Sequence, residues 1–176
     1  QPRLFTASPL HGLDEHLREV GRLAKMFATT FGAADLAELA GLWHDLGKYR
    51  PGFQRYIQLP AGNEAHIEGR VPGKDKTHSG AGALHAIERF GIAGRVLAYL
   101  IAGHHGGLAD WHGRLDARLA VDNPDTRCEF DEARAAAPTE LLALGSAPDL
   151  RNIPDGSKGF ALWVRMLFSC LVDADF

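Results

Sequence analysis

The residues of this sequence that could carry chemistry are histidines and aspartates at the ends of apolar stretches. Nine histidines occur in 176 residues, and neutral imidazole is the commonest metal-ligand side chain. His44-Asp45 follows an apolar run and precedes Leu46-Gly47-Lys48. At a helix end a carboxylate can bridge two ions while the adjacent imidazole binds one. Lys48 returns to the side of His44 if the helix continues and could hold a substrate phosphate; the alternative is a helix end with a lysine beside its dipole.

A second signal is His104-His105, which ends an apolar stretch and precedes Gly106-Gly107. Burying two imidazoles without partners costs free energy, so these side chains need a ligand or solvent. The glycines let the backbone turn away and leave space for a ligand. The alternative is a polar helix end that faces solvent.

Four other positions complete the set of candidates. His78 opens a run of small residues, with Ser79 next to it, and small residues permit close packing or the approach of a substrate. His16 lies beside the apolar face of the first expected helix. Asp173 lies in a strongly apolar stretch and needs a cation, hydrogen-bond donors or a metal as its partner. Asp175, two residues on, is expected to point elsewhere and to be solvated. Ordinary surface or boundary positions remain the alternatives for both histidines.

The elements that must position these residues are helices. Apolar residues at spacings of three and four predict an amphipathic helix from Asp14 to about Phe31. Further helices are predicted over 33–46, 78–90, 92–105 and 159–174, shorter ones near 51–59, 129–136 and 139–144, and a loop over 60–76. No alternating strand pattern stands out. The predicted fold class is therefore all-α.

Composition narrows the class of protein further. A hydrophobic content of 45% is ordinary for a globular domain, and no apolar stretch reaches the roughly 18 residues of a membrane span. Cys128 and Cys170 cannot make a disulfide framework, so a reducing cytoplasm is expected. The first residues show no signal-peptide pattern, and the missing initiator Met suggests a trimmed chain. A net charge of −3 argues against a broadly positive surface, so any nucleic-acid contact must be local.

The order of the candidates (His, then His-Asp, then His, then His-His, then Asp) is more informative than any one of them. With these residues the chain resembles the HD phosphohydrolase superfamily and, more narrowly, the nuclease domain of the type I CRISPR-associated helicase-nuclease. The resemblance spans nearly the whole chain and is weakest in 60–76 and 109–156. The stretches that carry it are 14–17 with Val20, 41–48, 53–56, 78–83, 101–108 and 168–175.

The resemblance implies one HD helical bundle over 1–176, with a two-metal pocket between its helices and Asp45 as the bridging ligand. Lys48 and Ser79 would contact the scissile phosphate or the attacking water. The helicase portion of the family should follow, so the chain is expected to be a separated domain or a stand-alone nuclease subunit. The implied ligands are His16, His44, Asp45 and Asp173 for one ion, and Asp45, His78, His104 and His105 for the other.

The implied function is a metal-dependent deoxyribonuclease that cuts single-stranded DNA in CRISPR interference, by two-metal hydrolysis and with Asp45, Lys48 and Ser79 as its catalytic residues. A helicase domain or subunit and a CRISPR surveillance complex are the implied partners. The imidazole-rich ligand set favours Mn, Fe, Co, Ni or Zn, with Mg as a weaker option.

Two other functions stay open: an HD phosphohydrolase of nucleotides or cyclic dinucleotides, and a metal-stabilised interaction module without catalysis. Retention of Lys48 and Ser79 beside the ligands favours catalysis. Some remaining cations could line a channel for the strand, although most are expected to be surface charges: Arg55, Lys74, Lys76 and Arg165. The other histidines are expected to be surface or core residues: His11, His66, His85 and His112.

Overall fold

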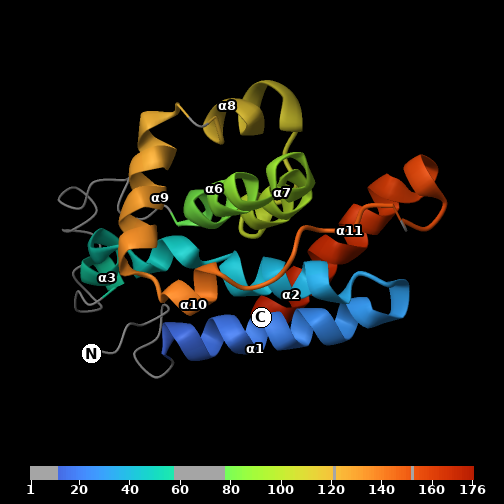
Figure 1. The fold of residues 1–176 in the computed structure, drawn as a ribbon, viewed down its shortest axis with the longest axis horizontal. Helices are drawn as coiled ribbons and strands as arrows, with labels where there is room; N and C mark the ends of the chain where they lie inside the picture. The colour runs from blue at the N-terminus through green and yellow to red at the C-terminus, as the bar shows by residue number, and fades with distance from the viewer. Residues whose placement is uncertain (1–11, 58–77, 121, 152) are drawn as a thin grey trace.

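The computed structural model describes residues 12–57, 78–120, 122–151 and 153–176, and helices dominate these ranges (Figure 1). No β-strand occurs in the described ranges, so the predicted all-α fold class is confirmed. The α-helices are α1 (Leu13–Ala28), α2 (Ala34–Trp43), α3 (Pro51–Ile57), α6 (Ser79–Phe90), α7 (Gly94–Gly103), α8 (Asp116–Arg118), α9 (Pro124–Ala136), α10 (Thr139–Leu142) and α11 (Gly156–Asp175). Short 3-10 turns are η1 (Thr29–Phe31), η2 (Leu46–Tyr49) and η3 (Gly91–Ala93). The segment η4 (Trp111–Leu115) is kinked, because the backbone leaves helical geometry at His112 and Gly113.

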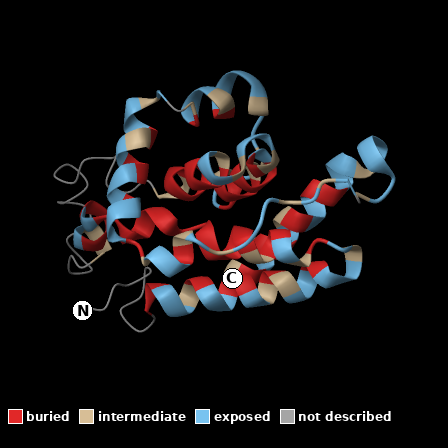
Figure 2. Cartoon of the chain, in the orientation of Figure 1, coloured by how far each residue is buried: buried red, intermediate tan, exposed pale blue. Residues whose placement is uncertain are grey.

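Helix α1 forms where the apolar spacing predicts it. Leu13, Leu17, Val20 and Ala24 are all buried along one face, and acidic residues in the first turn suit the positive end of the helix dipole. The α-helical part ends at Ala28, and η1 extends it by one 3-10 turn. This buried face packs on α2, as the strip of buried residues in Figure 2 shows.

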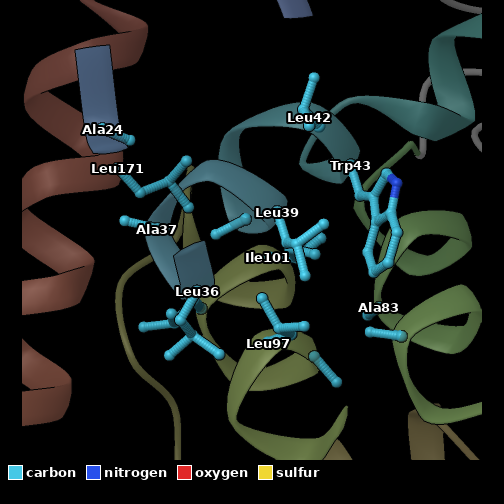
Figure 3. Packing of buried hydrophobic residues seen from close by; sticks show 14 of the residues in the cluster. Ala24, Leu36, Ala37, Leu39, Leu42, Trp43, Ala83, Leu97, Ile101 and Leu171 are labelled. Atoms are coloured by element: carbon cyan, nitrogen blue, oxygen red, sulfur yellow. The ribbon is translucent and has the colours of Figure 1, made fainter. Parts of the chain in front are cut away.

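Helix α2 lies at the centre of the core and is buried on nearly all sides. Its contact with α1 is close because Gly41 faces Gly21: a Cβ on Gly41 would lie 2.6 Å from the Gly21 Cα. On the other side, Leu39 and Trp43 pack with Ile101 of α7 (Figure 3). The Trp43 indole donates a hydrogen bond of 3.0 Å to the Leu141 carbonyl in α10, which satisfies its only buried donor.

The remaining long helices surround this centre. Helices α6 and α7 pack against each other on one side of α2, α9 crosses α6 and η2, and α11 contacts α1, α2 and α7 (Figure 1). Among the described helices, none combines the length and the apolar character that a membrane span requires. The packing therefore brings together the end of α2, the start of α6, and the ends of α7 and α11.

Some predicted boundaries differ from the structure. The helix predicted over 33–46 ends at Trp43, because Asp45 leaves helical geometry with φ −108°. The helix predicted from 129 starts at Pro124, because Asn123 caps it by accepting from the amides of Asp125 and Thr126 at 3.1 and 3.2 Å. The final helix begins at 156 rather than 159. The loop predicted over 60–76 lies outside the described residues.

Candidate metal centre

Histidine and aspartate side chains from five segments converge between the helices. They come from α1, the α2–η2 junction, the residue before α6, the two residues after α7, and the end of α11. They form two groups that share Asp45, and within each group the potential ligand atoms lie within 4.8 Å of one another. One group is His16, His44, Asp45 and Asp175; the other is Asp45, His78, His104 and His105.

The shared carboxylate is fully buried, and its two oxygens face different histidines. Asp45 Oδ2 lies 3.2 Å from His44 Nε2 and 3.6 Å from His16 Nε2. Asp45 Oδ1 lies 3.3 Å from His78 Nε2 and 3.4 Å from His104 Nε2. Each oxygen therefore belongs to one group, which is the arrangement that a bridging carboxylate needs.

Backbone contacts orient two of these imidazoles. His44 Nδ1 donates to the Gly41 carbonyl and His104 Nδ1 donates to the Ile101 carbonyl, each at 2.7 Å. With the proton on Nδ1, a neutral imidazole presents the lone pair of Nε2 to the centre of the site. Such an outer contact is the usual device that fixes the tautomer and direction of a metal-binding histidine.

Several buried polar atoms of the site make no hydrogen bond of good geometry within the described part of the chain: His16 Nε2, His104 Nε2 and both oxygens of Asp45. Buried groups left in this state cost free energy, so clusters of them call for an explanation. A cation between these acceptors would satisfy them together, and nitrogen and carboxylate donors suit a divalent metal. The residues present therefore fit a metal centre.

Charge on the two carboxylates agrees with this fit. Burial alone would raise the pKa of Asp45, but the neighbouring imidazoles, His44 foremost, hold it well below its usual value. Burial likewise opposes ionisation of Asp175, yet contacts from His16 and His44 lower its pKa. Burial by itself would lower the pKa of His44, but the charge of Asp45 and the contact with Asp175 raise it to about 10. The carboxylates stay ionised, and a metal would compete with protons for the imidazoles.

The aspartate that α11 contributes to the site is Asp175, whereas the sequence-based prediction was Asp173. Asp173 is exposed, whereas Asp175 Oδ1 lies 3.2 Å from both His16 Nε2 and His44 Nε2. The two positions differ by roughly 200° around a helix, so only one of them can face the site. The apolar repeat contained the signal, because Asp175 follows the buried Leu167 and Leu171 at intervals of four. The expectation that Asp175 is solvated is wrong.

Lys48 is buried beside the shared carboxylate, with Nζ 2.5 Å from Asp45 Oδ2. It does not reach this place by continuing α2. It sits in the 3-10 turn η2, where its amide donates to the Asp45 carbonyl at 2.9 Å. Its ammonium also lies 5.9 Å from the centre of the Phe53 ring. The position suits the predicted phosphate contact, which stays a prediction.

One close backbone contact sets His78 beside Asp45. The Gly47 amide donates to the His78 carbonyl at 3.2 Å, and a Cβ on Gly47 would lie only 2.2 Å from that oxygen. Only glycine permits this approach of η2 to the start of α6. His78 Nε2 then lies 2.7 Å from His105 Nε2, so the second group of ligand candidates lies between the start of α6 and the end of α7.

The other residues singled out from the sequence lie elsewhere or at the margin. Ser79 follows His78 as the first residue of α6, and its Oγ accepts from Arg118 at 3.3 Å. His85 is buried against Trp43, and His112 is exposed. Of the cations proposed for a channel, Arg55 and Arg165 are exposed. His11, His66, Lys74 and Lys76 lie outside the described residues.

Comparison with known families agrees with this geometry. The family model described as the HD domain matches residues 13–137. The chain belongs to the HD domain family. No curated protein matches the chain. The HD-domain match confirms the predicted membership of the HD superfamily. HD domains bind divalent metals and typically act as metal-dependent phosphohydrolases. The matched region contains every ligand candidate of this HD domain except Asp175.

Proposed function

We propose that this HD domain is a two-metal phosphodiesterase that cuts single-stranded DNA. The observation that carries the proposal is Asp45, whose two oxygens face separate groups of imidazoles. Two-metal sites use such a shared ligand to hold ions roughly 4 Å apart. Each group supplies three further ligand side chains, which is enough to hold one ion.

Mostly nitrogen ligands suit Mn, Fe, Co, Ni or Zn better than Mg, which prefers oxygen. Bound ions of this kind supply a water of lowered pKa and stabilise the attacking and leaving oxygens of a phosphodiester. The ligand set for one ion is His16, His44, Asp45 and Asp175, and for the other Asp45, His78, His104 and His105.

The chain's own residues would bind and orient the phosphate. The Lys48 ammonium lies beside Asp45 and can donate to a phosphate oxygen at the same place. Ser79 Oγ, next to the ligand His78, can donate to another phosphate oxygen or to the attacking water. Burial of Lys48 and Asp45 excludes bulk water, which strengthens these interactions.

A single strand is the substrate that this site favours. His44, Asp45 and His104 are buried at helix ends. A phosphate must therefore leave the surface of its own polymer to reach them, and duplex DNA resists such a deformation. A net charge of −3 offers no broad electrostatic grip on a duplex. A flexible single strand delivered by a helicase can bend one phosphate into the site, and it does not depend on a broad positive surface to stay bound. We therefore propose a CRISPR interference nuclease, with a helicase and a surveillance complex as its partners.

The test compares substrates and metals directly. The protein is stripped with chelator, reloaded with Mn, Co, Ni, Zn, Fe or Mg, and offered circular single-stranded DNA, the matching duplex, nucleotides and cyclic dinucleotides. We expect cleavage of the single strand to be fastest, to vanish with chelator, and to return better with Mn, Co or Ni than with Mg. Faster turnover of nucleotides or cyclic dinucleotides would make the protein a small-molecule phosphohydrolase. Absence of any hydrolysis would leave a metal-stabilised interaction module.

A further inference from the structure

A cavity of about 510 Å³ lies directly beside the metal centre and shares His78 with it. Its walls come from the end of η2, the start of α6, α8 and the first turns of α9. Its volume falls in the range of roughly 300–1,000 Å³ that is typical of small-molecule sites. A larger cavity of about 680 Å³, between α2 and residues 144–150, contains none of the ligand residues.

Arg118 is the group in this cavity that is best suited to bind an anion. Its Nη2 donates to Ser79 Oγ at 3.3 Å and to the Ala102 carbonyl at 3.4 Å, both of them neutral acceptors. Within the described part of the chain no carboxylate pairs with it. A guanidinium carries five donors in a planar fork that matches a phosphate. Arg118 therefore keeps donors for a phosphate at the edge of the cavity nearest the metal ligands.

The other charged groups of the cavity are differently placed. Arg50 is buried in an ion pair with Glu132 at 3.0 Å. Glu129 is buried and accepts from the Ala81 amide at 3.0 Å, and Asp125 is an exposed carboxylate in the first turn of α9. Both carboxylates repel a phosphate from the α9 side. The charge pattern thus confines a phosphate to the side of Arg118 and Ser79.

We propose that this cavity binds the nucleotide next to the one whose phosphate is hydrolysed, and that Arg118 holds the phosphate of that neighbouring nucleotide. The inference rests on the proposed phosphodiesterase function of the metal centre. Successive phosphates of a strand are one nucleotide apart, and the cavity begins where the metal ligands end, at His78 and Ser79. A substrate with a single phosphodiester has no group that reaches Arg118.

Substrate length provides the test. Wild type, Arg118→Ala and Arg118→Lys are compared on a single-stranded oligonucleotide and on bis(4-nitrophenyl) phosphate, which has one phosphodiester. Arg114→Ala is the matched control, because it removes the same charge from an exposed side chain outside the cavity. Binding of a phosphorothioate oligonucleotide, measured by fluorescence anisotropy, gives a readout that does not depend on turnover.

For the oligonucleotide we expect Arg118→Ala to lower kcat/KM about tenfold, mainly through KM, which corresponds to about 1.4 kcal/mol. The dissociation constant should rise by a similar factor, Arg118→Lys should recover part of the loss, and hydrolysis of the small diester should not change. An equal loss on both substrates would show that Arg118 only clamps α6 to α7, and an unchanged oligonucleotide reaction would also overturn the inference. Arg118-dependent binding without hydrolysis of any phosphodiester would instead refute the proposed function and leave the cavity assignment standing.

Discussion

At the scale of single residues, the site depends on the direction of a few side chains rather than on the number of histidines. Asp45 is the clearest case, because a fully buried carboxylate faces four imidazole nitrogens and one ammonium. Such a group is costly to bury unless cations compensate it. The proposed role of Asp45 as the shared ligand leads to two predictions about carboxylates.

Replacement of Asp45 should remove both metals together. We expect Asp45→Ala and the near-isosteric Asp45→Asn to lose at least about 100-fold in phosphodiesterase activity, as expected when electrostatic stabilisation of a transition state is lost. Metal analysis should show that neither position fills normally. Far-ultraviolet circular dichroism should retain the helical signal, because the apolar core does not include this side chain. Near-normal cleavage at matched metal would exclude the two-metal mechanism.

The two aspartates at the end of α11 should behave differently. Asp175→Asn removes a carboxylate that lies 3.2 Å from two imidazoles, so metal affinity should fall by about tenfold or more. Asp173→Asn changes an exposed group two residues away and should bind metal like the wild type. Isothermal titration with Mn or Zn measures both. If Asp173→Asn were the weaker binder, the ligand assignment would have to be reversed.

At the scale of elements, close contacts between helix ends hold the ligand candidates in position relative to one another. Gly41 lets α1 and α2 approach, and Gly47 lets η2 touch the start of α6. Glu129 of α9 adds a hydrogen bond to the first turn of α6, at the Ala81 amide. These contacts cross between segments that are distant in sequence. A small change at one of them should therefore displace a ligand that lies elsewhere in the chain.

Gly47→Ala tests this dependence. A methyl group would meet the His78 carbonyl at 2.2 Å, so η2 and the start of α6 must separate. We expect a loss of stability of about 1–3 kcal/mol, typical of overpacking, and weaker metal binding because His78 moves from Asp45. Gly106→Ala is the control: it adjoins the ligand His105, but an added Cβ there meets nothing within 4 Å. Urea unfolding and metal titration should show a lower stability and a lower metal affinity for Gly47→Ala than for Gly106→Ala. Equal values for the two variants would contradict the proposed role of Gly47.

At the scale of the whole molecule, the pH dependence of stability also reflects a histidine outside the metal centre. His85 is buried between α2 and α9, against the rings of Trp43 and Phe130, and its Nε2 donates to the Leu142 carbonyl at 3.1 Å. Burial is the main cause that lowers its pKa to about 4; the hydrogen bond to Leu142 and the charge of Glu88 oppose this shift, and Arg89 and Arg134 add to it.

Because the folded protein holds His85 neutral, the unfolded chain binds its proton more readily. The stabilisation by this group is fully present above the ordinary histidine pKa of about 6.5 and is lost as the pH falls towards about 4, by about 3 kcal/mol at most. His85→Gln can keep the donor to Leu142 and should lose less stability over this range than the wild type. Urea unfolding at several pH values measures the difference, and the exposed His112→Gln serves as the control. Parallel pH profiles for wild type and His85→Gln would contradict this account.

The sequence by itself determined the helical class of this HD domain and most of its ligand candidates. Apolar spacing is a local property, and without any tertiary contact it places His16, His44-Asp45, His78 and His104-His105 on or at the ends of helices. The fold of those helices then brought the six residues together. Helix α9 starts before the predicted residue 129, at the position that the Asn123 cap and the following proline mark in the sequence.

The tertiary structure alone decided which atoms face one another. The apolar repeat of α11 favours Asp175 over Asp173, but only the packing of this face towards α1 and α2 places Asp175 beside His16 and His44. The tertiary structure also assigned each oxygen of Asp45 to its own pair of histidines and placed Arg118 beside Ser79. These relations join residues far apart in the chain, and no local pattern encodes them. They follow from the way the helices pack. That packing depends on side-chain volume, on close contacts at glycines and on buried hydrogen bonds together.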